Sequence, residues 1–269
     1  MVARSGQELL EICNQRGISL SEYAIQMEME NSESTREEVI NKMKATLKVM
    51  IDSATEGIEK EVYSVTGLIG GDGYRVNQYL KKGETLTGTT TVMAMAMALS
   101  SSEVNASMGR IVACPTAGSC GILPAVILSA GSKLDKTEDE LVMGLFAAAA
   151  VGTIIAMNAT VSGAEGGCQA ECGSAAAMGS AAVVEMMGGT PKMSLDAAAI
   201  VLKNILGLVC DPVAGLVEIP CAKRNAAGAV SALCTADLVM AGVESKIPFD
   251  DTVSAMYKVG KQLPAELRE

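Results

Sequence analysis

Along the first 57 residues, charged positions alternate with apolar ones at the spacing of an amphipathic helix. The apolar positions between residues 40 and 50 are spaced 3-4-3 and share one helical face, and Gly57 is the expected stop. Three hydroxyl residues are followed three positions later by glutamate, the capping-box pattern that satisfies free amides at a helix start. These pairs are Ser19 with Glu22, Ser34 with Glu37, and Thr137 with Glu140. The pattern predicts solvated N-terminal helices with one buried stripe.

From about Val62 onward the chain is dominated by Ala, Gly, Ser, Val and Met, small or flexible side chains that suit closely packed helices better than sheets. Residues 111–132 and 141–164 carry no charge. Pro115 and Pro124 interrupt the first stretch, and the second has too few Leu, Ile and Phe to insert strongly into a membrane. We therefore expect residues 141–164 to form a buried central helix rather than a membrane span.

Two more helices are expected in the C-terminal third. The first begins at Thr190-Pro191 or at Ser194 and ends near residue 210, because Pro212 cannot continue a helix. An apolar-periodic run follows over residues 222–241. Nothing in the pattern indicates a parallel sheet or an internal repeat.

The sequence thus predicts an all-α protein, a large helical domain with a buried central helix and long loops that carry candidate ligands. Residues 1–60 are expected to form charged helices packed on a catalytic body over residues 61–269, most simply as one continuous domain. A chain of 269 residues is long enough to bury about three quarters of its unfolded surface.

The composition excludes several classes of function. A net charge of −10 and an aromatic content of 3% leave little to contact phosphates or stack on bases, so nucleic-acid binding is not expected. The chain has no histidine, which excludes a Ser-His-Asp or Cys-His centre built from this chain alone. The N-terminus lacks the apolar core of a signal peptide, and the eight cysteines are too unevenly placed for a disulfide framework. We expect a protein of the reducing cytoplasm.

The cysteines divide by their setting. Cys13 and Cys234 lie in apolar helical runs, where a free cysteine behaves as a small hydrophobe. Cys114 and Cys120 flank a small-residue loop that fits either an anion cradle or an ordinary turn. A third group consists of Cys168, Cys172, Cys210 and Cys221. Without histidine, such a group would select zinc, copper(I) or an iron–sulfur cluster, and the absence of paired C-x-x-C motifs argues against a zinc ribbon.

Three blocks, residues 105–124, 163–173 and 210–225, resemble the iron–sulfur-dependent bacterial L-serine dehydratases, specifically their α subunit. The resemblance implies a [4Fe–4S] cluster held by Cys168, Cys210 and Cys221. Three thiolates for four irons leave one iron to act as a Lewis acid on the serine hydroxyl. The implied reaction converts L-serine to pyruvate and ammonia, without pyridoxal phosphate.

The resemblance also suggests roles around the substrate. Thr116, Gly118 and Ser119 are candidates to hold its carboxylate, and Arg224 offers bidentate geometry for the same group. Ser119 and Lys223 are the candidates for the base. Ordinary surface charges are the alternative interpretation of Lys223 and Arg224.

Single-chain members of this family carry a Ser-Ser-Ser-His motif that is absent here, so we expect a β subunit to supply the missing domain. Other functions stay open. A desulfidase acting on cysteine could use the same scaffold, and a non-catalytic iron–sulfur or interaction subunit could use Cys172 as a fourth thiolate. A pyridoxal enzyme is a further alternative, with residues 66–73 as a glycine-rich phosphate loop, although no lysine has a recognisable Schiff-base setting.

Overall fold

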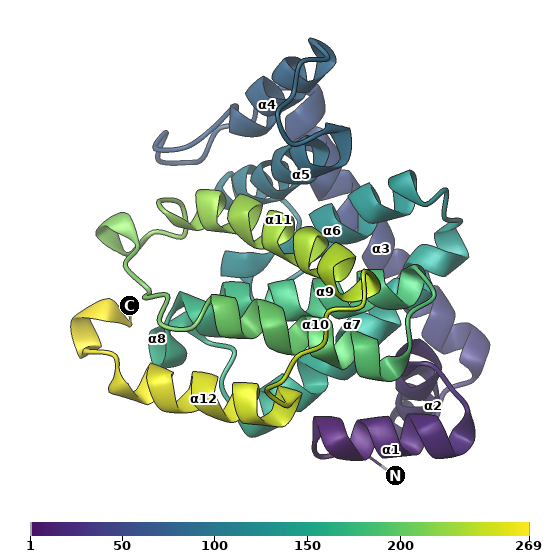
Figure 1. Cartoon of the computed structure of the whole chain (residues 1–269). Helices are drawn as coiled ribbons and strands as arrows, with labels where there is room; N and C mark the ends of the chain where they lie inside the picture. The colour runs from purple at the N-terminus through teal and green to yellow at the C-terminus, as the bar shows by residue number, and fades with distance from the viewer. Residues whose placement is uncertain (1, 269) are drawn as a thin grey trace.

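The computed structural model describes residues 2–268, and over this range it contains helices and turns but no β-strand, which confirms the all-α prediction (Figure 1). The first six helices are α1 (Gly6–Arg16), α2 (Leu20–Ser32), α3 (Arg36–Glu59), α4 (Asp72–Lys81), α5 (Thr89–Ala106) and α6 (Ile122–Lys133). The others are α7 (Glu138–Asn158), α8 (Gly163–Gly166), α9 (Ser174–Met186), α10 (Pro191–Asn204), α11 (Cys221–Met240) and α12 (Phe249–Gln262). Short turns η1 (Ala117–Ser119), η2 (Gln169–Gly173), η3 (Val213–Gly215) and η4 (Ala265–Leu267) connect them.

Helix α9 is the centre of the molecule, with α6, α7, α10 and α11 packed around it (Figure 1). Nearly all of its residues are buried, and most are Ala, Ser or Gly. These small side chains let neighbouring helices approach closely: a Cβ added at Gly179 would lie 3.2 Å from Val126 of α6. The small-residue composition therefore sets the spacing of the core.

Helix α7 forms where the uncharged stretch 141–164 predicted it, but it ends at Asn158. It is the one helix among residues 2–268 that is long and apolar enough to cross a membrane, and 56% of its most apolar window is buried against other helices. Partial burial of this kind is also found in core helices of soluble proteins. The helix covered on every side is α9 rather than α7.

Two of the three predicted helix starts are confirmed. Ser19 accepts a hydrogen bond from the Glu22 amide at the start of α2. Thr137 and Glu140 form a complete capping box on α7. The start of α10 is fixed at Thr190, whose hydroxyl accepts from the Met193 amide.

The predicted box at Ser34 and Glu37 is wrong by one residue. Thr35 and Glu38 form the box instead, and α3 begins at Arg36. The stop at Gly57 is also wrong, because α3 continues to Glu59. A Cβ at Gly57 would lie 2.9 Å from the Ser100 Cα of α5, so this glycine permits a close helix crossing rather than a helix end.

Carboxylates of the helical body hold the N-terminal helices in place. Glu185 of α9 accepts hydrogen bonds from the first amides of α2, and Asp250 of α12 accepts from the Gly6 and Gln7 amides that begin α1. A negative charge at a helix N-terminus is favourable because free amides and the helix dipole converge there. One apolar core includes side chains from both parts of the chain, and the boundary near residue 60 stays a prediction.

Several connecting segments meet on one side of the molecule, where α8, the α10–α11 connection and the C-terminal turn lie close together (Figure 1). The buried side chain of Gln169 joins three of them: its amide donates to the Gly166 and Met256 carbonyls, and its oxygen accepts from the Gly207 amide. The Cys210 amide donates to the Leu267 carbonyl at 2.9 Å. These bonds fix the loops that carry the candidate ligands.

Candidate active site

Four buried thiols gather where these loops meet. Cys168 precedes the π-helical turn η2 that contains Cys172, Cys210 lies in the α10–α11 connection, and Cys221 begins α11. The Cys168 and Cys172 Sγ atoms are 3.8 Å apart. A Cβ added at Gly163 would lie 3.1 Å from the Cys210 Sγ. Cys168 interacts electrostatically with both Cys210 and Cys221, so the three cysteines that the resemblance implies lie in one neighbourhood.

Burial disfavours the thiolate form of two of these cysteines. It raises the pKa of Cys210 to about 12 and that of Cys221 to about 11, and the charge of Cys168 acts in the same direction on both. The hydrogen bond from Cys172 and the nearby Arg224 charge lower the pKa of Cys168 despite its burial. Binding a soft metal centre would displace the remaining protons, since the thiolate is the ligand form.

The thiols fit a cluster better than a single ion. Within residues 2–268, no three Cys, Asp or Glu side chains converge closely enough to hold one metal ion. An iron–sulfur cluster takes one thiolate per iron, so its ligands stand apart from one another. A buried, all-sulfur donor set without imidazole also matches the ligand preference of such clusters.

Arg224 is the cation of this site. Its guanidinium pairs with Asp211 at 2.7 Å and donates to the Val209 carbonyl at 3.0 Å, and only 18% of its side chain is exposed. The neighbouring Lys223 points away from the thiols: its Nζ lies 2.5 Å from an Asp72 carboxylate oxygen, and 59% of its side chain is exposed. Arg224 thus belongs to the thiol site, and Lys223 belongs to the N-terminal end of α4.

The turn at residues 116–119 lies beside the thiols through η2. The Thr116 hydroxyl donates to Glu171 Oε1 at 2.9 Å and lies 3.2 Å from the hydroxyl of Ser119, which is fully buried. Asn225 of α11 ties the turn down by donating to the Gly118 carbonyl at 2.7 Å and accepting from the Gly121 amide at 2.9 Å. The predicted Thr116, Gly118 and Ser119 therefore stand together.

Sequence reasoning gave no role to Glu171 or Asn225. Glu171 lies inside the glycine- and cysteine-rich block, one residue before Cys172, and its partly buried carboxylate also accepts from the Gly163 amide. Burial is the main cause that raises its pKa. An acidic residue directly beside a cysteine in a block rich in glycine and alanine was the available signal.

The chain matches the family model "Serine dehydratase alpha chain" over residues 15–269. It belongs to the serine dehydratase alpha chain family. It is 48% identical to the probable L-serine dehydratase, alpha chain, of Bacillus subtilis, with 99% of this chain and 88% of that protein covered. It is 46% identical to the L-serine dehydratase, alpha chain, of Peptoniphilus asaccharolyticus, with 98% and 91% covered. The resemblance inferred from the three sequence blocks is confirmed.

A longer relative adds information on chain organisation. L-serine dehydratase 1 of Escherichia coli is 34% identical, and this chain, aligned over 99% of its length, covers 60% of it. The family's fold therefore also occurs next to a further segment in the same polypeptide.

The remaining cysteines of this serine dehydratase family member lie elsewhere. Cys13 is buried, as predicted, whereas the prediction for Cys234 is wrong, because its side chain on α11 is exposed. Cys114 and Cys120 are buried near each other, and Cys120 has its Sγ 3.7 Å from the Ser101 carbonyl. Desolvation raises the pKa of both thiols, that of Cys120 to about 12. These two thiols are therefore packing groups.

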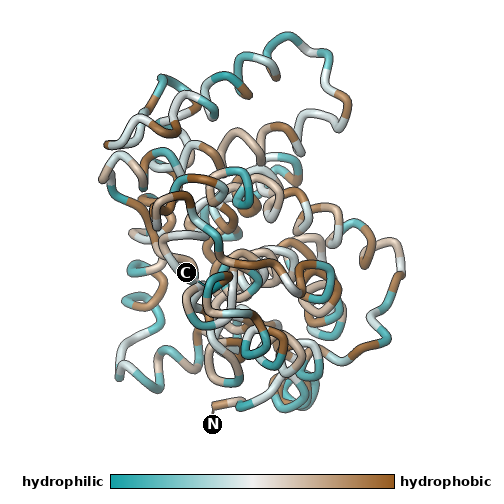
Figure 2. The backbone as a smooth tube through the Cα atoms, turned by 90° about the vertical axis from the view of Figure 1, so that its left-hand side faces the viewer, coloured by the Kyte–Doolittle hydropathy of each residue, from teal (hydrophilic) through white to brown (hydrophobic). Residues whose placement is uncertain are grey.

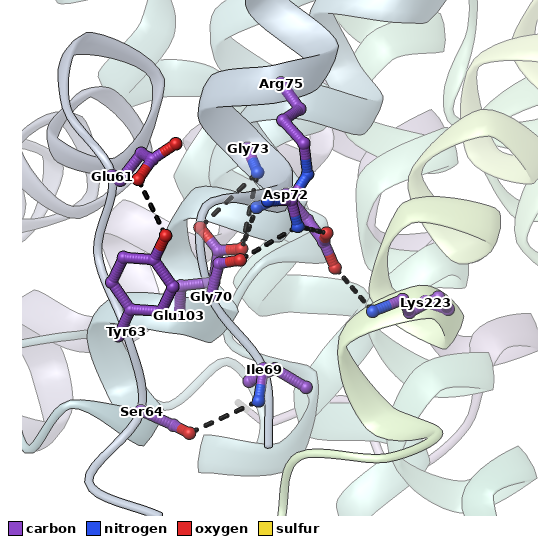
Figure 3. A network of polar contacts seen from close by, with 10 residues as sticks. All are labelled: Glu61, Tyr63, Ser64, Ile69, Gly70, Asp72, Gly73, Arg75, Glu103 and Lys223. Carbon is purple, nitrogen blue, oxygen red and sulfur yellow. Dashed lines mark hydrogen bonds and ion pairs between the residues drawn. The ribbon is translucent and has the colours of Figure 1, made fainter. Parts of the chain in front are cut away.

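The glycine-rich loop does not hold a phosphate in this family member. Buried Glu103 of α5 accepts from the Asp72 amide at 2.6 Å and from the Gly73 amide, so the N-terminus of α4 already has an anion (Figure 3). Asp72 pairs in turn with Arg75 and Lys223. A protein carboxylate occupies the position that a cofactor phosphate would need, which disfavours the pyridoxal alternative.

Proposed function

We propose that this chain is the α subunit of an iron–sulfur L-serine dehydratase, which converts L-serine to pyruvate and ammonia. The observation that carries the proposal is the gathering of Cys168, Cys210 and Cys221 in a chain of this family. A carboxylate, Glu171, and a guanidinium, Arg224, act on the same thiols. Opposite charges beside one centre complement a zwitterionic amino acid.

The cofactor of this proposal is a [4Fe–4S] cluster bound by Cys168, Cys210 and Cys221. When bound by three thiolates, such a cluster supplies an iron that polarises the substrate hydroxyl as a Lewis acid. The chain's own contribution is burial. The segments α8, η2 and the α10–α11 connection cover the thiols and keep bulk water away from them. Arg224 offsets the negative charge of the thiolates.

The substrate carboxylate is assigned to Arg224, with the turn of Thr116, Gly118 and Ser119 beside it. Arg224 combines partial burial with the fork geometry that binds carboxylates. The Thr116 hydroxyl already donates its proton to Glu171, so backbone amides of this turn, rather than that hydroxyl, would donate to the substrate carboxylate.

Neither candidate base has a free path to the thiols. Lys223 is held by Asp72, and Ser119 is enclosed behind Thr116. Since the chain has no histidine, this arrangement favours a base contributed by a partner subunit. Ser119 and Lys223 stay predictions for direct proton transfer.

Hydrophobic segments lie among hydrophilic ones along the backbone (Figure 2). A β subunit is the proposed partner, and its contact surface is proposed at two loops, the one before α4 and the one after α5. Exposed apolar side chains stand there on adjoining loops: Val65 is 73% and Met108 84% exposed. The Val65 amide donates to the Ala106 carbonyl, and the Thr66 hydroxyl donates to buried Glu218 of the α10–α11 connection. Exposed apolar loops beside a site are typical of an interaction surface.

The proposal is tested by co-expressing the chain with its partner subunit and purifying the complex under argon. We expect pyruvate release from L-serine, proportional to bound iron, and no release after iron is removed. Sulfide release from L-cysteine, measured in parallel, separates the desulfidase alternative. Full activity of iron-free complex would refute the cluster mechanism.

A further inference from the structure

Glu171 differs in its partners from two other carboxylates of the interior, Glu103 and Glu185, whereas buried Glu218 also accepts from a hydroxyl, that of Thr66. Glu103 and Glu185 each accept hydrogen bonds from amides that begin a long helix, α4 or α2. Such carboxylates complete a helix N-terminus and have an evident structural role. Glu171 accepts from the Thr116 hydroxyl and from the amide of Gly163, at the start of the single-turn helix α8.

Among residues 2–268, no cation forms an ion pair with Glu171. Arg224, the guanidinium that acts on the same thiols, pairs with Asp211 at 2.7 Å and contributes no charge to Glu171. Lys223 is bound to Asp72. A partly buried carboxylate with neutral partners is costly unless a cation joins it in the working state.

Two glycines allow the backbone to approach this carboxylate closely. A Cβ at Gly118 would lie 3.1 Å from Glu171 Oε2, and one at Gly163 would lie 2.7 Å from the same oxygen and 3.1 Å from the Cys210 Sγ. Side chains at either position would therefore crowd the carboxylate and the thiol together. A small cation placed at Glu171 lies directly beside a proposed cluster ligand.

We propose that Glu171 binds the α-ammonium group of the amino-acid substrate. This inference rests on the proposed function and adds to it a determinant of substrate class. The ammonium supplies the cation that Glu171 lacks, and Arg224 takes the carboxylate of the same molecule. With the ammonium and the carboxylate of Cα both held, the hydroxymethyl branch of the same carbon is left to point toward the thiols. Glu171 therefore selects amino acids over hydroxy acids that lack the amino group.

The experiment compares Glu171→Gln with Glu165→Gln in the α–β complex, purified under argon with matched iron content. Glu165 lies in the same block with an exposed side chain, which makes it the matched control. We expect Glu171→Gln to raise KM for L-serine about 10- to 100-fold, the range for loss of a hydrogen bond between charged groups. Glu165→Gln should leave KM within about twofold, as expected of a surface substitution.

Two competitive inhibitors separate ammonium binding from a merely structural role. Ethanolamine carries the ammonium and hydroxyl groups, and 3-hydroxypropanoate carries the hydroxyl and carboxylate. The Ki of ethanolamine should rise by the same factor as KM in Glu171→Gln, whereas the Ki of 3-hydroxypropanoate should stay unchanged or fall, because a like charge has been removed. Equal changes for both inhibitors would show a structural defect and overturn the inference.

Glu171→Asp is a second variant that keeps the test decisive if Glu171→Gln does not fold or does not bind iron. It keeps the charge on a shorter side chain, and its KM should lie between those of the wild type and Glu171→Gln. A wild-type complex that releases pyruvate together with variants of unchanged KM would refute the role of Glu171 alone. A wild-type complex that releases no pyruvate from L-serine would refute the proposed function, and this inference with it.

Discussion

Two charged regions flank the first turn of α11, and they are built in opposite ways. In the α4 network, formed by Glu103, Asp72, Arg75 and Lys223, Asp72 pairs with both cations and Glu103 accepts from the two amides that begin α4 (Figure 3). In the thiol site, burial raises the pKa of Cys210 and Cys221, and Glu171 has only neutral donors. Charged groups whose hydrogen bonds and ion pairs are made within the chain stabilise the fold, whereas groups that lack a partner of opposite charge indicate where a cofactor and a substrate bind.

The largest expected effect concerns the ligands of the thiol site. Cys210→Ser should abolish iron binding and L-serine turnover, because a hydroxyl is a poor ligand for a cluster iron. Cys172→Ser should retain the iron, since three thiolates suffice in the proposed site. Exposed Cys234→Ser is the control. Iron content and visible absorption under argon provide the measurement, and loss of iron from Cys172→Ser equal to that from Cys210→Ser would contradict the three-thiolate site.

The next effect tests whether the α4 network is structural. Burial raises the pKa of Glu103 from 4.5 to about 7. Between these values the folded chain holds more protons than the unfolded chain, so this group lowers the free energy of unfolding as pH rises from 4.5 to 7 and contributes no further change above 7. A shift of this size corresponds to about 3 kcal/mol.

Glu103→Gln should remove this dependence while keeping one oxygen to accept from the α4 amides. Urea unfolding of the wild type and the variant at pH 5 and pH 7.5 measures the difference. The variant should gain stability relative to the wild type by up to about 3 kcal/mol between the two pH values. A constant difference would show that Glu103 is not desolvated in the fold.

A smaller effect compares two neighbours that belong to different regions. Arg224→Lys keeps the charge but loses the fork geometry, so KM for L-serine should rise about tenfold, the equivalent of one lost charged hydrogen bond. Lys223→Met should leave KM within about twofold. Steady-state kinetics of the α–β complex tests both, and a large loss of kcat in Lys223→Met would support the prediction that this lysine is the base.

The sequence located helices well where a local rule applies. The capping hydroxyls Ser19 and Thr137 act on their own first turn, so four consecutive residues contain the whole signal. The failure at Ser34 reflects a competition between two adjacent hydroxyls, Ser34 and Thr35, each followed by a glutamate at the right spacing. The failure at Gly57 is of another kind, because its partner Ser100 lies 43 positions away and no local pattern encodes that contact.

The same distinction applies to the site. The proposed cysteine ligands follow from the resemblance of three long sequence blocks to a family to which the chain is now shown to belong. The pairing of Lys223 with Asp72, and of Thr116 with Glu171, joins residues 151 and 55 positions apart. Such pairs depend on how α4, α11 and η2 pack together, which composition and periodicity do not specify.

The smallest expected effect is on the free energy of unfolding. Asp72 has two cationic partners in the α4 network, so the loss of one partner should change the stability little. Lys223→Met removes an ion pair whose lysine is largely exposed, and Asp72 keeps its pairing with Arg75. Exposed pairs contribute at most about 1 kcal/mol, so urea unfolding at pH 7 should show a loss below that value, and the loss should shrink as salt is raised. A loss above about 2 kcal/mol, insensitive to salt, would mean that Lys223 supports α11 itself. The comparison between the α4 network and the thiol site would then fail at Lys223, the residue that joins the two regions.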